Sequence, residues 1–315
     1  MILLKIFYKI ISGEKAVTNL LIIGGCGSIG QNLIEIIPKE TPIFVLDKIL
    51  CREYTSSCKY FQCDLTDVHS IDLIASKLPD DLIVVYLAGN LITSTTKEAI
   101  LNSVRDNITA LVNFMTSISS KLKHLIYVSS LSVYGIPKYV PVDEDHPINP
   151  SSIYGSEKAC GELISKSLCN LYKIPLTIIR STQLFGLSSA EQTLPHILLN
   201  RLKLKENVKI LCDPNCERDY LHVSDFSRFI FEITKTPIEG IFNIGSGRGI
   251  KILDLFRSSF DTFGIPFDPK KTIDIQSITS YSIVLNIEKA HHLYGFRPKY
   301  TIEEWFKDNA KDNIL

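Results

Sequence analysis

Residues 19–30 read NLLIIGGCGSIG, a short apolar run followed by a loop whose glycines recur three apart. The apolar run predicts a strand, and we expect a helix to open near Ser28. Gly24, Gly27 and Gly30 suit this loop because a side chain would obstruct a tight turn and the close approach of a pyrophosphate. The spacing is G-x-x-G-x-x-G rather than G-x-G-x-x-G, but its place between a strand and a helix predicts a dinucleotide site.

Similar apolar runs recur along the chain, separated by segments long enough to form helices. These runs show little polar alternation, which is typical of parallel strands buried on both faces. We therefore predict an α/β fold with a doubly wound parallel (Rossmann) sheet. The runs are PIFVLD (42–47), DLIVVYLAG (81–89), HLIYVSS (124–130), PLTIIRS (175–181) and GIFNIGSG (240–247).

The regular alternation of runs and helical segments breaks after about residue 181. We expect residues 1–182 to form the Rossmann domain, with 1–18 as an N-terminal extension. Residues 183–315 would form a smaller, discontinuous substrate-binding region over the carboxyl ends of the strands. Within that region, 222–245 is expected to return to the Rossmann domain.

Composition is that of a soluble globular protein, with 45% hydrophobic and 22% charged residues in 315. The 34 basic and 34 acidic side chains cancel, so no nucleic-acid partner is expected. The eight cysteines have no disulfide-framework spacing, and we expect them to be reduced. Cys212 and Cys216 lie four apart without a second Cys/His pair nearby, so we expect no metal site.

The N-terminal extension, MILLKIFYKIISGEKAVT, is apolar with interspersed lysines. It is too short and interrupted to span a bilayer, and it lacks a small-residue cleavage site. An amphipathic helix on a membrane surface and a simple packing extension both fit this pattern. We favour the extension, and we expect a cytoplasmic protein without membrane association.

Two aspartates follow expected strands near the glycine loop. Asp47 ends the second apolar run, where its carboxylate could accept hydrogen bonds from a ribose diol and would repel a 2′-phosphate. That favours NAD over NADP, although a capping or turn aspartate is the alternative. Asp64, in FQCDLTD, is placed to meet an adenine edge; taken alone, it would be a turn residue.

A tyrosine and a lysine lie four residues apart in SSIYGSEKACGE (151–162), namely Tyr154 and Lys158. On a helix they would project from one face, where phenol and ammonium could act on one hydroxyl group. The pair alone is weak evidence because such helical pairs are usually solvated. It gains weight from the glycine loop before it and from YVSSLSVYG (127–135), which contains Ser130.

With these motifs in this order, the chain resembles the extended short-chain dehydrogenase/reductase family, and within it the NAD-dependent nucleotide-sugar epimerases and dehydratases. The resemblance runs from Asn19 to the segment 288–304. It implies NAD as the cofactor, a nucleotide-diphosphate sugar as the substrate and a homodimer built from two long helices per subunit. It also implies that Ser130, Tyr154 and Lys158 are catalytic.

The resemblance carries further roles onto individual residues. Substrate contacts would come from Ser130, Ser132, Gln183 and Arg218. Cofactor contacts would come from Gly24, Gly27, Ser28, Ile29, Gly30, Asp47, Asp64, Leu65, Leu87, Ala88, Gly89, Asn107, Tyr154 and Lys158.

The implied chemistry is proton abstraction from a sugar hydroxyl while hydride leaves the same carbon for NAD⁺. A tyrosine with its ordinary pKa near 10 is a poor base at neutral pH. We expect Lys158 and the positive nicotinamide to stabilise the phenolate and lower the pKa of Tyr154. Ser130 would hydrogen-bond the reacting oxygen.

Departures from the family pattern reduce the number of family activities that fit this chain. Relatives that dehydrate their sugar carry an acidic pair where this chain has Leu131 and Ser132. Gln183 stands where many relatives have asparagine, and the segment 278–290 lacks a second diphosphate-binding arginine beside Arg218. We therefore predict a nucleotide-sugar 4-epimerase. The alternatives are a dehydrogenase or keto-sugar reductase with net redox, a UDP-glucuronate decarboxylase, and a non-catalytic NAD-binding protein.

Overall fold

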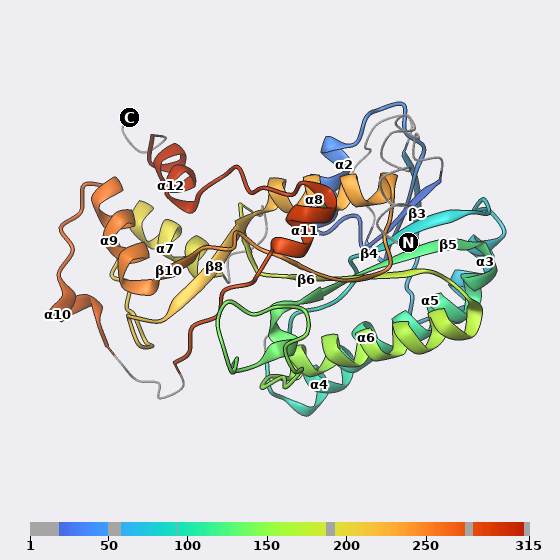
Figure 1. The fold of residues 1–315 in the computed structure, drawn as a ribbon, viewed down its shortest axis with the longest axis horizontal. Coiled ribbons are helices and arrows are strands. Elements are labelled where there is room, and N and C mark those ends of the chain that lie inside the picture. The colour runs from blue at the N-terminus through green and yellow to red at the C-terminus, as the bar shows by residue number, and fades with distance from the viewer. Residues whose placement is uncertain (1–18, 50–57, 93, 187–192, 275–279, 312–315) are drawn as a thin grey trace.

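A seven-stranded parallel sheet forms the centre of the larger part of the molecule (Figure 1). Its strand order is β3-β2-β1-β4-β5-β6-β9. The strands are β1 (Leu20–Ile23), β2 (Ile43–Asp47), β3 (Cys58–Gln62), β4 (Leu82–Tyr86), β5 (Leu122–Ser130), β6 (Leu176–Ser181) and β9 (Gly240–Ile244). The computed structural model describes residues 19–49, 58–92, 94–186, 193–274 and 280–311.

The predicted doubly wound fold is confirmed. All six apolar runs quoted above form strands of this sheet, and β1 is buried along its whole length. The strand order reverses between β1 and β4, which is where ligands bind in such sheets, beyond the carboxyl ends of the strands. The third strand ends at Gln62, two residues before Asp64.

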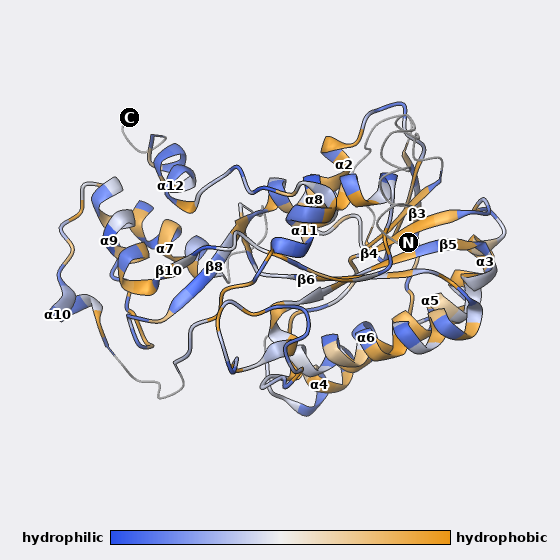
Figure 2. Ribbon diagram, viewed as in Figure 1, coloured by the Kyte–Doolittle hydropathy of each residue, from blue (hydrophilic) through white to orange (hydrophobic). Residues whose placement is uncertain are grey.

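Helices cover both faces of the sheet, and each face has its own apolar core. On one face lie α2 (Ser28–Ile36), α8 (Val223–Lys235) and α11 (Glu288–Tyr294). On the other lie α3 (Val68–Ala75), α4 (Lys97–Val104), α5 (Ala110–Ile118) and α6 (Ile153–Tyr172). Figure 2 shows strands that are mostly hydrophobic and helices with one hydrophobic and one hydrophilic side. Burial of these faces is the main source of the fold's stability.

A smaller sheet lies beside the large one, with the order β10-β8-β7. Its strands are β7 (Gln183–Phe185), β8 (Glu217–His222) and β10 (Gly249–Lys251). The helices around it are α7 (Leu194–Lys203), α9 (Ile252–Thr262), α10 (Pro269–Thr272) and α12 (Ile302–Lys311). They enclose a separate core in which Phe185 packs on Trp305 with ring centroids 5.5 Å apart.

Two later segments of the chain pack on the large sheet. Strand β9 pairs with β6, and α8 packs against α2. Helix α11 lies over β9, where Lys289 Nζ donates to the Ile241 carbonyl at 2.7 Å and Ala290 is fully buried. The sequence alone predicts such a return only for residues 222–245. The domain division at residue 182 stays a prediction.

The N-terminal extension, residues 1–18, lies outside the described residues. Among the described helices, none is both long and apolar enough to cross a bilayer.

Candidate functional site

Two glycines of the loop after β1 are required by its shape. Gly24 has a φ of +81°, and a Cβ there would lie 2.8 Å from the backbone nitrogen of Ala88. A Cβ on Gly30 would lie 2.5 Å from the Cα of Gly25, so the first turn of α2 packs directly on the loop. Only glycine tolerates both environments without displacing backbone.

Gly27 is different because a Cβ there would meet a single described atom within 4 Å, the Gly24 carbonyl oxygen at 3.4 Å. Gly27 is also the N-cap of α2, whose first-turn N–H groups therefore have no capping side chain from that position. An anion can approach the helix N-terminus through this space. The loop thus fits the pyrophosphate of a dinucleotide.

A cavity of about 360 Å³ opens beside this loop at the carboxyl ends of β1, β2 and β4. Eight of the expected cofactor residues line it: Gly24, Gly27, Asp47, Asp64, Leu65, Leu87, Ala88 and Gly89. The other expected cofactor residues, which are Ser28, Ile29, Gly30, Asn107, Tyr154 and Lys158, are not part of its wall. Wall residues that sequence reasoning missed include Lys48, Thr66, Asn90 and Asp106.

Both aspartates have defined places at the cavity. The Asp47 carboxylate accepts hydrogen bonds from the backbone N–H groups of Cys26 at 2.9 Å and Ile49 at 3.2 Å. These contacts hold it at the end of β2, between the glycine loop and the following turn. Asp64 accepts from the backbone N–H and the hydroxyl of Thr66, at 2.9 and 2.8 Å. Asp64 is therefore a turn residue that also faces the cavity.

The expectation of reduced cysteines is wrong at Cys26, inside the glycine loop. Cys26 is disulfide-bonded, whereas Cys58, Cys63, Cys160, Cys169, Cys212 and Cys216 are free thiols. Cysteine spacing alone gave no sign of this bond, because a disulfide depends on distance in the fold.

The structure brings Ser130, Tyr154 and Lys158 together. Ser130 is the last residue of β5, and its hydroxyl lies close enough to the Tyr154 phenol to lower the pKa of that phenol. Tyr154 and Lys158 lie in the first two turns of α6, with Lys158 Nζ 5.9 Å from the centre of the Tyr154 ring. Lys158 Nζ also donates to the Val128 carbonyl at 3.0 Å. Helix α6 thus presents both side chains to the end of β5.

The helix is set against this strand end by its first turn. The Ser152 hydroxyl caps α6 by accepting from the Gly155 N–H at 3.0 Å. A Cβ on Gly155 would lie 2.5 Å from the Ser132 carbonyl oxygen in the short helix η3 (Leu131–Tyr134). The absence of a side chain at Gly155 therefore allows the two elements to touch.

Burial dominates the pKa values of the reacting groups. It raises the pKa of Tyr154 to about 12, although the Ser130 hydrogen bond acts in the opposite direction. The expected lowering of this pKa depends on Lys158 together with the nicotinamide of bound NAD, and it stays a prediction; among the protein groups alone, desolvation of the phenolate outweighs the other contributions. Burial also lowers the pKa of Lys158 to about 8, against the opposing effect of Glu157 and Glu162. Burial therefore opposes the charged form of both side chains.

Asn107 lies in a π-helical turn, η1 (Arg105–Thr109), between α4 and α5. Its Oδ1 accepts from the Asn90 N–H at 2.7 Å, and its Nδ2 donates to the Asn90 carbonyl at 3.0 Å. Nδ2 also donates to Glu157 Oε2 at 2.6 Å. Asn107 therefore clamps the end of the segment after β4 to α6.

Gly89 marks the point where the cavity wall meets the Tyr154–Lys158 pair. A Cβ on Gly89 would lie 3.1 Å from Asn107 Oδ1 and 3.2 Å from Lys158 Nζ. Because Gly89 also lines the cavity, Lys158 and Asn107 lie just behind the wall at this end. A dinucleotide in the cavity would have its far end at Lys158.

The expected substrate residues come from different elements. Ser132 is next to Ser130, with their hydroxyl oxygens 3.1 Å apart. Gln183 follows the end of β6, where Ser181 pairs with Ser130. Arg218 is on β8 of the small sheet, where its Nη1 donates to the carbonyls of Glu217 and Tyr281. Its guanidinium also lies 5.1 Å from the centre of the Tyr281 ring.

Residues 20–245 match the model of a family described as the NAD dependent epimerase/dehydratase family. The chain belongs to this family. Its cofactor is NAD, in agreement with the loop and cavity described above.

Similar proteins cover nearly the whole chain. The UDP-glucose 4-epimerase of Lactobacillus helveticus is 25% identical, over 92% of this chain and 98% of its own. A putative UDP-glucose 4-epimerase of Methanocaldococcus jannaschii is 26% identical over 93% and 99%. The structure of Thermotoga maritima UDP-glucose 4-epimerase with UDP-glucose matches with a TM-score of 0.82 and 23% identity, over 93% and 98%. The last of these likenesses shows the shared fold.

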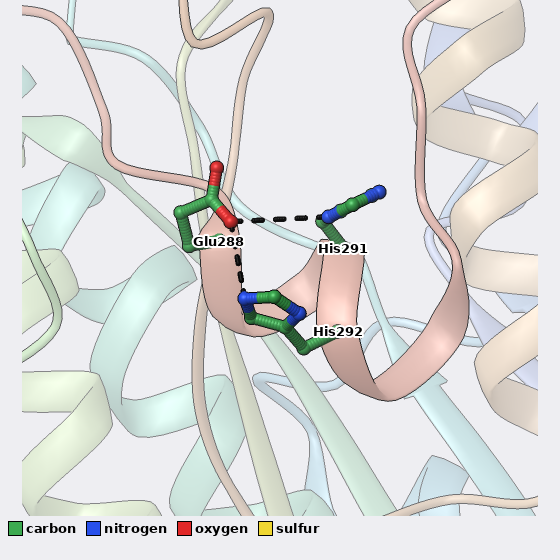
Figure 3. A group of neighbouring side chains, drawn as sticks. All are labelled: Glu288, His291 and His292. Carbon is green, nitrogen blue, oxygen red and sulfur yellow. Dashed lines mark ion pairs between the residues drawn. The ribbon is translucent and has the colours of Figure 1, made fainter.

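One group of metal-type ligands among the described residues lies away from the epimerase/dehydratase site, on α11 (Figure 3). Glu288 Oε2 lies 3.8 Å from His291 Nδ1 and 3.2 Å from His292 Nε2. The side chains of Glu288 and His292 are 67% and 72% exposed, so solvent screens these contacts. No other described residue orients either imidazole ring, which is the support that protein metal sites generally have.

Proposed function

We propose that this protein is a nucleotide-sugar 4-epimerase that acts through a transient 4-keto sugar. The observation that carries the proposal is the meeting of Ser130, Tyr154 and Lys158 at the inner end of the dinucleotide cavity, with Lys158 Nζ 5.9 Å from the centre of the Tyr154 ring and next to Gly89 of the cavity wall. These are the groups needed to hold a hydroxyl oxygen and remove its proton.

Each residue has a distinct part in the proposed reaction. Bound NAD supplies the hydride acceptor and later the donor. Tyr154 takes the proton from the sugar hydroxyl and returns it, while Ser130 hydrogen-bonds the same oxygen. Burial holds the phenol proton strongly, so the charge of Lys158 is needed to stabilise the phenolate that must be present before Tyr154 can take the sugar proton. Epimerisation would require the site to let the keto sugar turn over, so that its opposite face can be reduced.

The positions after Ser130 favour epimerisation over dehydration. Leu131 is buried and apolar, and the Ser132 hydroxyl is engaged with Ser130. Neither position offers the carboxyl group that loss of water from the keto sugar requires as acid or base. We therefore expect the keto sugar to be reduced in this site and not dehydrated.

Arg218 is our candidate for binding the substrate diphosphate. Its Nη1 is held by two backbone carbonyls, while no described residue accepts from Nε or Nη2. A planar guanidinium presented in this way suits a diphosphate. We test UDP-sugars first because the similar epimerases above are named for UDP-glucose.

The test is incubation with UDP-glucose, UDP-N-acetylglucosamine, UDP-glucuronate and the matching GDP- and dTDP-sugars, followed by proton NMR. Inversion at C4 without net change in absorbance at 340 nm is the expected result. Stoichiometric NADH formation would instead show net oxidation, and a pentose product from UDP-glucuronate would show decarboxylation. No conversion of any sugar would contradict the proposal.

We also propose a homodimer in which α6 contributes the interface. Leu163 and Leu171 are 60% and 66% exposed on this helix, and Leu101 on the neighbouring α4 is 59% exposed. Apolar side chains gathered on adjacent helices are typical of surfaces that bind a partner. Light scattering should give a dimer mass for the wild type and a monomer mass for Leu163→Asp. Leu204→Asp, in the small-sheet region, is the control and should remain dimeric; a monomeric wild type would contradict the proposal.

A further inference from the structure

A buried glutamate, Glu157, lies directly before Lys158 and is not among the residues assigned to the reaction above. Its Oε2 accepts hydrogen bonds from Asn107 Nδ2 at 2.6 Å and from the Ser103 hydroxyl at 2.8 Å. Its Oε1 is buried with no hydrogen-bond partner among the described residues. A buried carboxylate oxygen without a hydrogen bond lowers the stability of the fold, so we expect Glu157 to have a function that offsets this cost.

The first consequence of Glu157 is the orientation of the Asn107 amide. A carboxylate can only accept hydrogen bonds from a neutral amide, so it requires the Nδ2 end of Asn107 on its side. The Oδ1 end then faces the Asn90 N–H and the position beside Gly89 and Lys158. Glu157 thereby holds the Asn107 amide in the orientation that bonds the Asn90 backbone, in the cavity wall next to Lys158.

The second consequence is electrostatic. Two buried carboxylates act on Lys158, namely Glu157 and Glu162. Glu162 is already paired with the buried Arg180, which donates to both of its oxygens at 2.9 and 2.8 Å. Glu157 forms no ion pair with a described cation. Its negative charge is therefore the one available to balance Lys158.

The other groups facing Lys158 do not supply that balance. From β5 come the Tyr127 ring, 5.5 Å away, and the Val128 carbonyl; from α6 comes the Tyr154 ring. Burial raises the pKa of Tyr127 well above its ordinary value, so that phenol is neutral. Asn107, from η1, is uncharged. Glu157 is thus the unpaired negative charge in this group.

We infer that Glu157 is a positioning residue for the proposed reaction, one that orients Asn107 and supplies the counter-charge of Lys158. It acts through these two residues without touching the substrate. The inference rests on the proposed function, since it assigns Glu157 a part in that same site. Removal of its charge should lower the pKa of both reacting groups, because Glu157 raises the pKa of Tyr154 and that of Lys158.

The test is the pH dependence of turnover in Glu157→Gln, compared with the wild type. Glutamine keeps an oxygen to accept from Asn107 but removes the charge. Both limbs of the profile should move to lower pH by about one unit, because the variant removes a charge that attracts the Lys158 ammonium and repels the Tyr154 phenolate. The pair titrates as a unit, so the limbs report the pair rather than single residues. A purely structural role would lower the rate without moving the limbs.

Affinity for NAD, measured at several pH values by titration calorimetry, is a readout that does not require turnover. In Glu157→Gln the affinity should fall off at lower pH than in the wild type. Glu98→Gln, an exposed glutamate on α4, is the charge-matched control and should follow the wild type. Superimposable wild-type and Glu157→Gln curves, in turnover or in NAD affinity, would overturn the inference.

Glu157→Asp keeps the inference testable if the glutamine variant does not fold. Its charge remains but its carboxylate is one methylene too short to reach Asn107. We expect the pH limbs to stay in place and NAD affinity to fall severalfold, and unchanged NAD affinity would overturn the positioning role. A wild type that binds NAD but converts no nucleotide sugar would refute the proposed function instead. The pH dependence of NAD affinity would still test the role of Glu157.

Discussion

The large-sheet region and the small-sheet region are built in different ways. Around the cavity, most wall residues lie at or just beyond the ends of parallel strands, and backbone shape is decisive, as at Gly24. In the small-sheet region, Arg218 depends on contacts with Tyr281, 63 residues further along the chain. Short strands and long connections dominate there. We therefore propose that the large-sheet region determines the chemistry and the small-sheet region determines which sugar enters.

The largest effect should come from removing the reacting group of the large-sheet region. Tyr154→Phe deletes the phenol that takes the proton, so turnover should fall by about 10²–10⁴-fold. NAD affinity should stay close to that of the wild type, because loss of one hydroxyl leaves the cavity wall and Lys158 in place. Turnover by NMR and NAD binding by calorimetry test both statements.

Tyr172→Phe, at the end of the same helix, is the matched control and should keep wild-type turnover. Equal turnover in the Tyr154 and Tyr172 variants would show that the reaction does not use Tyr154.

Two glycine variants in the large-sheet region should distinguish a glycine that the backbone conformation requires from a glycine that leaves space for the ligand. Gly24→Ala places a Cβ at a positive φ against the Ala88 backbone, so it should destabilise the fold by about 1–3 kcal/mol. Gly27→Ala should leave the melting temperature unchanged and weaken NAD binding by about tenfold or more, because its Cβ enters the space for the pyrophosphate.

Thermal melting with and without NAD measures both effects. If Gly27→Ala lowers the melting temperature of the protein without NAD as much as Gly24→Ala does, the distinction between the two glycines is wrong.

The smallest effect should come from the small-sheet region. Arg218→Lys keeps a positive charge but loses the planar fork and the contact with the Tyr281 ring. The KM for the nucleotide sugar should rise by about tenfold with little change in kcat, since the diphosphate is distant from the reacting carbon. NAD affinity should be unaffected. A fall in kcat at unchanged KM would place Arg218 in the chemistry and break the comparison.

Sequence reasoning was most successful where the relevant signal is local. The apolar runs predicted the strands of the large sheet, and the helix after the glycine loop begins at Ser28 as expected. The spacing of Tyr154 and Lys158 correctly placed them on one helix. The expectation of reduced cysteines was wrong at Cys26, where a disulfide is formed.

Glu157 is the clearest residue that sequence reasoning missed. In the sequence it is one more charged residue beside Lys158, which is normally a solvated helix position. Its burial follows from the packing of α6 against η1, which brings it to Asn107, 50 residues earlier in the chain. The one available signal was the small residues at Gly161 and Ser165, which share its helix face and are also buried.

The sequence by itself determined the fold class, the dinucleotide loop and the order of Ser130, Tyr154 and Lys158, because each depends on residues that are near one another in the chain. Tertiary structure alone decided which charges are buried, which way the pKa values move and what Arg218 contacts. Those properties depend on desolvation and on partners tens of residues away, and a linear pattern carries no information about either.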